Sequence, residues 1–212
     1  MSAEARHACG LCGVVNHPSA VEMVYLGLYA QQHRGQESAG ICSSDGRTIQ
    51  RRAGLGLVTD ALSAADLDAL KNPIATGHVR YSTTGSCSDA NTQPLLVRCS
   101  IGQVAVAHNG NLVNAAAIRR EYEQHGHIFA STSDTEVVLH MLADEHYARQ
   151  PDPLAAVLRH LLGSYCLLLH YPDRIEAVRD ASGNRPLCLG RLGLSLIHIS
   201  EPTRLLSISY AV

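Results

Sequence analysis

Hydrophobic and polar positions along the chain follow two periodicities, one typical of strands and one typical of helices. Short apolar or alternating segments predict strands over residues 11–15, 74–80, 101–107, 164–170, 174–179 and 186–189. A further alternating stretch, residues 40–58, is interrupted by Asp45-Gly46, a pair typical of hairpin turns. The pattern therefore predicts a chain rich in short strands.

Helical spacing of apolar residues predicts helices over residues 19–32, 114–124, 133–147 and 152–162. Two of these segments open on Ser19 with Glu22 and on Ser133 with Glu136, which have the spacing of a capping box. Asp152-Pro153 likewise suits a helix start. Because strands neighbour strands and helices come in blocks, the pattern predicts an α+β domain with antiparallel sheets.

The pattern of hydrophobic and polar residues changes after Gly193. Residues 194–212 are rich in Leu, Ile and Ser around Glu201-Pro202, and they continue neither the strand alternation nor a helix face. The stretch Ser-Leu-Ile-His-Ile-Ser-Glu-Pro-Thr-Arg resembles a translated sequencing adapter. We therefore expect residues 194–212 to be a non-native tail on a truncated chain.

Composition limits the classes of partner. The chain has 212 residues, 46% of them hydrophobic, and a formal net charge of -2, which predicts one globular domain. Its charges are spread out, and no apolar stretch approaches the roughly 20 residues of a membrane span, so neither nucleic acid nor a membrane is an expected partner. Seven cysteines without framework spacing, and no signal peptide, predict a reduced, cytoplasmic protein.

Four polar clusters lie beside glycine or at the ends of predicted elements, where a scaffold commonly presents a site. They are residues 33–36, 78–85, 108–112 and 133–136. Taken singly, Asn109-Gly110 is typical of a type I′ turn, and Asp134 is typical of a first helical turn, where the helix dipole favours an acid. His33, His78 and His108 are each as consistent with a packed, hydrogen-bonded histidine as with a catalytic one.

Cys9 and Cys12, in Cys-Gly-Leu-Cys, allow two chemistries. A C-x-x-C pair can bind metal or act in redox chemistry, but no second pair lies at zinc-finger spacing. Alternatively, a cysteine at a processed N-terminus carries its own base, because a free α-amine with a pKa of roughly 7.7 to 8.0 is partly neutral at physiological pH. For Cys9 that second chemistry requires removal of residues 1–8.

The order and spacing of these clusters resemble the class II glutamine amidotransferase domain, the group of N-terminal-nucleophile glutaminases. Within that family the chain most resembles the branch that works in purine biosynthesis. The matching blocks are distributed over residues 9–193, which is about nine-tenths of the chain. They are Cys9-Gly10, Gln32 to Gln36, Ser38 to Ile41, Gly77 to Thr83, Gln93-Pro94-Leu95, Ala107 to Val113, Thr132 to Val137 and Gly183 to Leu187.

The resemblance implies a fold and a domain organisation. The fold is a four-layer αββα Ntn-hydrolase sandwich, with two antiparallel sheets between helices. Residues 1–8 would be a propeptide, and residues 9–193 a glutaminase domain that is incomplete at its C-terminus. Since the family's nucleophile falls on Cys9, Cys12 is expected to be a buried small hydrophobic residue.

Carried over position by position, the resemblance implies a glutaminase site. Cys9 would attack the side-chain amide of glutamine and form a thioester, and Arg34 would organise its surroundings. The catalytic residues implied are Cys9, Asn109, Gly110 and Arg34. The residues implied to bind glutamine are Arg80, Tyr81, Thr83 and Asp134.

Alternatives within the family are glucosamine-6-phosphate synthase, asparagine synthetase and glutamate synthase. Three short segments favour the purine branch over glucosamine-6-phosphate synthase. They are Val79-Arg80-Tyr81, Asn111-Leu112 and residues 183–187. From a different class, a non-enzymatic metal-binding module built on Cys9 and Cys12 is the alternative.

The branch that the chain resembles also has a phosphoribosyltransferase domain, which binds phosphoribosyl pyrophosphate and Mg²⁺ and receives the ammonia. We expect that domain to be absent here, so the chain would at most hydrolyse glutamine to glutamate and ammonia. The resemblance implies no cofactor in this chain. For the full-length enzyme it implies Mg²⁺, in some members a [4Fe–4S] cluster, and a homo-oligomer, either a tetramer or a dimer.

Overall fold

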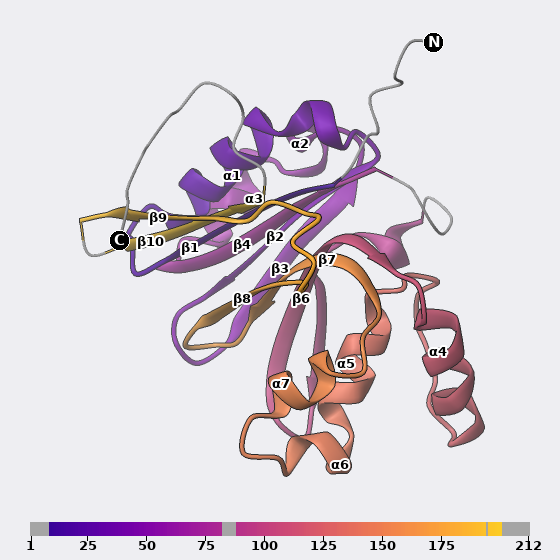
Figure 1. The fold of residues 1–212 in the computed structure, drawn as a ribbon. Coiled ribbons are helices and arrows are strands. Elements are labelled where there is room, and N and C mark those ends of the chain that lie inside the picture. Colours follow the sequence, from indigo (N-terminus) through magenta and orange to yellow (C-terminus); the bar gives the residue numbers. More distant parts are fainter. Residues whose placement is uncertain (1–8, 82–87, 194, 201–212) are drawn as a thin grey trace.

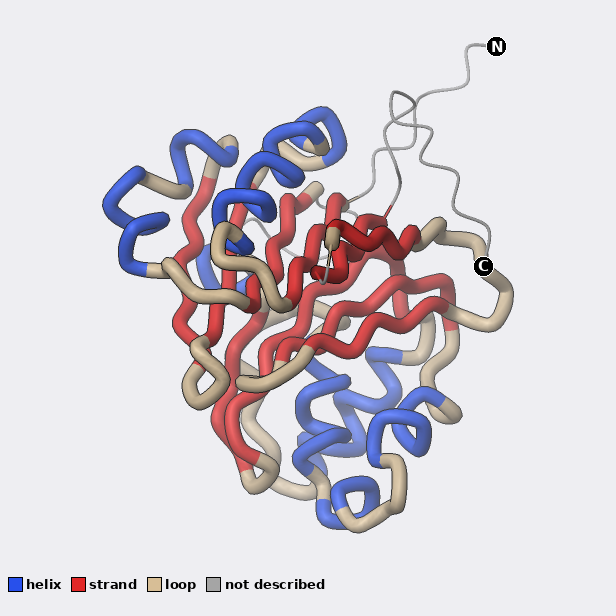
Figure 2. The backbone as a smooth tube through the Cα atoms, turned by 90° about the vertical axis from the view of Figure 1, so that its left-hand side faces the viewer, coloured by secondary structure: helices blue, strands red, loops and turns tan. Residues whose placement is uncertain are grey.

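The computed structural model describes residues 9–81, 88–193 and 195–200. These residues form four layers, in which two antiparallel sheets are stacked and helices cover the outer face of each (Figure 1). Figure 2 shows the same arrangement from the side, with the strands between two groups of helices. The α+β class and the αββα sandwich expected from the sequence are confirmed.

Sheet A is the six-stranded sheet, with the order β3-β2-β4-β1-β10-β9. Its strands are β1 Gly10–Val15, β2 Ser38–Ser44, β3 Ile49–Leu55, β4 Ile74–Arg80, β9 Cys188–Leu192 and β10 Ser195–Ser200. The helices of this half are α1 Ala20–Ala30, η1 Gln32–Arg34, α2 Val58–Ala61 and α3 Ala64–Ala69. β4 is buried along its whole length because α1 lies on one face and sheet B on the other.

Sheet B is the four-stranded sheet, with the order β5-β6-β7-β8. Its strands are β5 Leu95–Cys99, β6 Gly102–Leu112, β7 Gly163–His170 and β8 Ile175–Arg179. The helices of this half are η2 Asp89–Asn91, α4 Ala115–Gln124, α5 Glu136–Ala143, α6 Glu145–Ala148 and α7 Pro153–Leu158. Apolar residues of α4, α5 and α7 pack on β6 and β7 and form the largest core cluster among the described residues.

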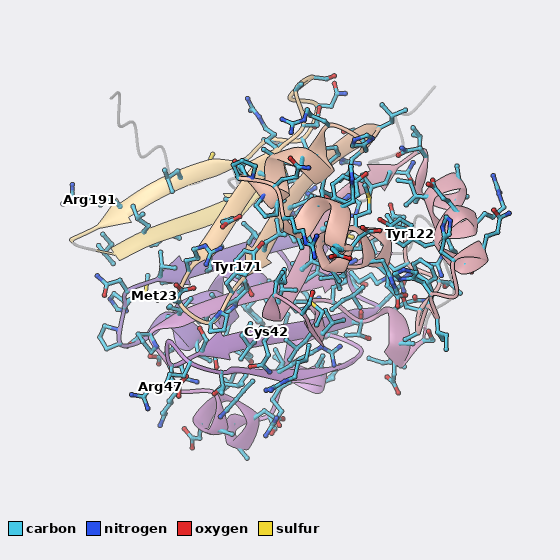
Figure 3. The ribbon with its side chains drawn as sticks, turned by 90° about the horizontal axis from the view of Figure 1, so that it is seen from below. Met23, Cys42, Arg47, Tyr122, Tyr171 and Arg191 are labelled. Atoms are coloured by element: carbon cyan, nitrogen blue, oxygen red, sulfur yellow. The ribbon has the colours of Figure 1, made fainter. Side chains whose placement is uncertain are left out.

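Apolar side chains fill the spaces between the layers. Val24 and Leu28 of α1 pack on β1, whereas the two clusters between the sheets are small: one includes Leu11 and Ala107, and the other Cys42 and Ala105. In Figure 3, Cys42 lies among the strands and is fully buried, while the side chain of Arg191 extends from the β9–β10 hairpin. The limited apolar filling between the sheets leaves room for buried polar groups there.

Two buried histidines link the sheets. His170 on β7 places Nε2 2.9 Å from Ser44 Oγ on β2 and Nδ1 2.9 Å from Thr76 Oγ1 on β4. One ring of sheet B therefore contacts two strands of sheet A. His78 on β4 places Nε2 3.1 Å from the carbonyl oxygen of His108 on β6. Burial lowers the pKa of His170 to about 4 and the pKa of His78 to about 3, so both rings are neutral at pH 7.

We expect the fold to lose stability as the pH falls below about 6.5, the pKa of an unfolded histidine. Because the folded pKa values of His78 and His170 are depressed, the unfolded chain binds more protons below that pH. The free energy of unfolding then falls by up to about 1.4 kcal/mol per pH unit for each histidine. Urea midpoints between about pH 7.5 and about pH 5 measure this slope. His170→Gln should flatten it and the exposed control His33→Gln should not; equal slopes would contradict the prediction.

The two predicted capping boxes are wrong. The side chain of Ser19 caps no helical N–H of α1. α5 begins only at Glu136, and the carboxylate of Glu136 accepts hydrogen bonds from the backbone N–H groups of Ala130 and Ser131 instead of forming a capping box with Ser133. The helix predicted over residues 133–147 is two helices, α5 and α6, separated at Asp144, whose side chain caps α6.

The strands differ from the sequence pattern in several places. β5 forms over Leu95–Cys99, where the pattern indicates no element, and β9 begins at Cys188 instead of residue 186. β6 extends to Leu112, so Asn109-Gly110 lies inside a strand and the type I′ turn is wrong for this pair. Residues 195–200, where the pattern indicates no element, form β10 through backbone pairing with β1 and β9.

Residues 1–8, 194 and 201–212 lie outside the described residues, and the propeptide, the domain limits and the origin of the tail stay predictions. Within the part of the chain that the structure describes, no helix is long and apolar enough to cross a membrane.

Candidate active site

Cys9 lies immediately before β1 and is half-buried. Its Sγ lies 3.7 Å from the carbonyl oxygen of Tyr81, because the pairing of β1 with β4 places the start of one strand beside the end of the other. Arg34, the last residue of η1, donates from Nε to the carbonyl oxygen of Cys9 over 3.2 Å. Two neighbouring segments therefore hold the predicted nucleophile.

Arg80 is the last residue of β4 and only 5% exposed. Its Nη1 lies 3.7 Å from Oε2 of Glu37, and the backbone N–H of Glu37 donates to the Arg80 carbonyl oxygen over 3.2 Å. Gly35 allows this approach, because a Cβ there would lie 2.6 Å from the Arg80 carbonyl carbon. A buried guanidinium needs a compensating charge, and Glu37 supplies one.

Asn109 and Gly110 lie in β6, opposite Cys166 and Tyr165 of β7. Asn109 is 1% exposed and shares a strand face with Ala107, which packs on the residue two positions after Cys9. Gly110 has a φ of +151°, and a Cβ there would collide with the Ser164 carbonyl oxygen. The strand pairing therefore accepts only glycine next to Asn109.

Asp134 lies just before α5, with its side chain 17% exposed. Its Oδ2 accepts a hydrogen bond from the backbone N–H of Leu112 over 2.9 Å, and its Oδ1 lies 3.6 Å from His108 Nδ1. Burial raises the pKa of the Asp134 carboxyl, but the interactions with His108 and Leu112 outweigh burial and hold that pKa below its ordinary value. Asp134 is therefore ionised at neutral pH.

The Cys9 thiol lies within electrostatic range of both charged residues. Burial is the largest influence and raises the pKa of the thiol above its ordinary value, while Arg80 lowers that pKa and Asp134 raises it. The thiol is therefore protonated at neutral pH and needs a base before it can attack an electrophile. A protonated thiol influenced by both a fixed cation and a fixed anion suits a ligand that carries one charge of each sign.

Cys12 faces away from this site. It is 1% exposed and packs with Val24 and Leu28 of α1, whereas Leu11 faces sheet B. Burial raises the pKa of its thiol to about 12. The expectation of a buried small hydrophobic residue is confirmed, and Cys9 and Cys12 are not placed as a metal-binding pair.

The remaining predicted residues have mixed outcomes. Tyr81 contributes its carbonyl oxygen near Cys9, and its side chain is 36% exposed. Thr83 lies outside the described residues. His78 and His108 are buried and hydrogen-bonded, whereas His33 is exposed on η1. The catalytic and glutamine-binding roles carried over from the resemblance stay predictions.

Sequence reasoning did not single out Glu37, Gln93, Thr135 or Arg185 as site residues. Glu37 and Thr135 each lie beside or within a polar cluster, which was the available signal. Gln93 contacts Thr135 and the backbone of His108. Burial and the positive charge of Arg185 lower the pKa of Arg34, so Arg185 also lies in electrostatic range of the site.

Comparison with known proteins agrees with this arrangement. The family model described as "Glutamine amidotransferase domain" matches residues 78–207. Amidophosphoribosyltransferase of Methanocaldococcus jannaschii is 45% identical over 86% of this chain and 40% of its own length. Amidophosphoribosyltransferase of Bacillus subtilis is 39% identical over 91% of this chain and 41% of its own length.

Solved structures give the same picture. A structure described as the allosteric regulatory enzyme of purine biosynthesis superposes with a TM-score of 0.84 at 37% identity, over 91% of this chain and 42% of that chain. Glutamine phosphoribosylpyrophosphate amidotransferase from B. subtilis, complexed with ADP and GMP, gives 0.82 at 36% identity, over 90% of this chain and 41% of that chain. The chain thus spans about 40% of the length of these relatives.

Proposed function

Because the chain belongs to the glutamine amidotransferase domain family, we propose that it hydrolyses glutamine to glutamate and ammonia with Cys9 as an N-terminal nucleophile. The observation that carries this proposal is the position of Cys9 immediately before β1, where its thiol lies 3.7 Å from the Tyr81 carbonyl oxygen, one residue after Arg80, and Arg34 holds its carbonyl oxygen over 3.2 Å. The charges of Arg80 and Asp134 both influence that thiol. Glutamine is a zwitterion, so these two charges can hold its α-carboxylate and α-ammonium groups while its side-chain amide reaches the thiol.

The chemistry begins when removal of residues 1–8 leaves Cys9 with a free α-amine. This amine takes the thiol proton, Sγ attacks the side-chain amide carbon of glutamine, and the oxygen of the tetrahedral intermediate becomes negative. The Asn109 side-chain amide and the Gly110 N–H donate hydrogen bonds to that oxygen. When the C–N bond breaks, the α-ammonium returns its proton to the departing ammonia, and a thioester remains.

Water completes the cycle. The α-amine takes a proton from water, the resulting hydroxide attacks the thioester carbon, and the same two donors stabilise the second oxyanion. The C–S bond then breaks, the sulfur regains the proton from the α-ammonium, and glutamate leaves. Arg34 supports both half-reactions by holding the Cys9 carbonyl oxygen, and Tyr81 and Thr83 complete the amino-acid pocket.

In a longer protein, the ammonia would serve a second reaction. The relatives named amidophosphoribosyltransferase support the proposal that ammonia is transferred to phosphoribosyl pyrophosphate to give 5-phosphoribosylamine. Within residues 9–81, 88–193 and 195–200, no three His, Cys, Asp or Glu side chains gather to hold a metal.

Covalent labelling tests the proposed function. We expect a diazoketone analogue of glutamine to modify Cys9, with glutamine protecting it, only in protein whose intact mass shows loss of residues 1–8. The rate of labelling should rise with pH around the α-amine pKa of about 7.7 to 8.0. The exposed Cys188 serves as the control thiol. Labelling of Cys188 instead of Cys9, or zinc-dependent folding without any labelling, would contradict the proposal.

A further inference from the structure

Asp134 belongs to a chain of buried hydrogen bonds that converges on Thr135. Gln93, His108 and Thr135 are 5%, 3% and 0% exposed. Gln93 Oε1 lies 2.7 Å from the backbone nitrogen of His108, and Gln93 Nε2 lies 3.1 Å from Thr135 Oγ1. His108 Nδ1 lies 3.0 Å from the same hydroxyl, which lies 3.4 Å from Asp134 Oδ1. Three segments far apart in sequence thus meet at one hydroxyl group.

The chemistry of the donors fixes the direction of each bond. The backbone N–H of His108 can only donate, so the oxygen of the Gln93 amide faces it and the NH₂ group faces Thr135. That NH₂ group also can only donate, so Thr135 Oγ1 accepts. The single hydroxyl proton is then directed to Asp134, because an ionised carboxylate can only accept. His108 Nδ1 consequently carries a proton and donates to Thr135.

These bonds connect the two ends of the candidate site. Both oxygens of Asp134 are fixed, since Oδ1 faces the Thr135 hydroxyl and Oδ2 accepts from Leu112 N–H. The same hydroxyl accepts from His108, which immediately precedes Asn109 on β6. The spacing between the carboxylate and the strand that carries Asn109 is therefore set by two contacts: the direct bond from Leu112 N–H, and the link through Thr135 to His108.

We propose that Thr135 is a positioning residue, whose hydroxyl orients the Asp134 carboxylate towards the α-ammonium group of glutamine. This inference rests on the proposed function and deepens it, because it assigns selection of the amino group to Asp134 and Thr135 together. The hydroxyl acts through Asp134 and touches no reacting atom.

Thr135→Val and Thr135→Ser form the matched test. Valine keeps the shape of threonine and removes the hydroxyl, whereas serine keeps the hydroxyl and removes the methyl group. We expect Thr135→Val to raise KM for glutamine roughly ten- to a hundredfold, with a smaller change in kcat, because a hydrogen bond to a charged group is lost. Thr135→Ser should keep KM within about threefold of the parent chain.

Glutaramate, which is glutamine without its α-amino group, separates positioning from a merely structural role. It has no ammonium group for Asp134, so Thr135→Val should leave its kcat/KM within about threefold. The preference for glutamine over glutaramate should therefore fall roughly ten- to a hundredfold in Thr135→Val. Equal losses for the two substrates, or the same loss of preference in Thr135→Ser, would overturn the inference.

Gln93→Met provides a second variant where Thr135→Val fails to fold, as judged by circular dichroism. It removes the donor to Thr135, so the preference for glutamine over glutaramate should fall several-fold, as in Thr135→Val. An unchanged preference would overturn the inference. A parent chain that loses residues 1–8 and still does not hydrolyse glutamine rejects the proposed function and this inference together. A parent chain that hydrolyses glutamine, with an unchanged preference in Thr135→Val, rejects this inference alone.

Discussion

Replacement of Cys9 by alanine is expected to reduce ammonia release from glutamine by at least about 10,000-fold, because removing the nucleophile of a covalent mechanism leaves only binding and oxyanion stabilisation. Cys9→Ser should be nearly as inactive, since a hydroxyl is a far weaker nucleophile than a thiolate at neutral pH. Ammonia and glutamate production by the processed protein, at saturating glutamine, measures the effect.

The control for this prediction is Cys188→Ser, which removes an exposed thiol on β9. It should leave activity within about twofold of the parent chain. A variant in which Cys9 directly follows the initiating methionine separates catalysis from processing, because it needs no removal of residues 1–8. Substantial glutaminase activity in Cys9→Ala would exclude Cys9 as the nucleophile and with it the proposed mechanism.

Replacement of Asn109 by alanine is expected to lower kcat by roughly 100- to 1000-fold, because one donor to the developing oxyanion is removed. KM should change little, since that oxygen becomes negative only in the transition state. Steady-state kinetics with glutamine, together with the rate of covalent labelling of Cys9, measure the two effects.

The control for the second prediction lies two residues further along β6. Asn111 is exposed, and Asn111→Ala should keep kcat within about threefold. Unfolding by urea distinguishes lost catalysis from lost structure, because Asn109 is 1% exposed and its replacement also has a packing cost. A fall in kcat for Asn111→Ala as large as that for Asn109→Ala would contradict the assignment of Asn109 as the donor.

The pattern of apolar residues identified β1, which follows Cys9, and β4, which ends at Arg80, but it ended the strand of Asn109 at residue 107 instead of at Leu112. β1, β4 and β7 follow the predicted segments closely, because their apolar positions are buried between layers and so leave a clear signal in the sequence. The helix starts were less predictable. Glu136 has the spacing of a capping box, yet its carboxylate binds the backbone of Ser131, a local alternative that spacing alone does not distinguish.

The candidate site was predictable only in part. Its charged and nucleophilic residues stand in short polar clusters, where their chemistry is visible in the sequence itself. The residues that hold them were not visible as site residues. Glu37, just before β2, contacts Arg80 at the end of β4 only in the folded chain, and the same is true of Gln93, just before β5, and Thr135, just before α5.

The α+β class and most of the strands follow from local periodicity, which can be read along the chain. The choice of Cys9 follows from the resemblance and stays a prediction. Three features appeared only in the folded chain: Asn109-Gly110 lies within a strand, Cys12 faces the helices, and the Thr135 hydroxyl adds a second link between Asp134 and β6. They were not predictable because the residues involved are far apart along the chain. Hydrogen bonds and ion pairs between residues tens of positions apart leave no periodic trace, and they form only when the layers of the sandwich pack.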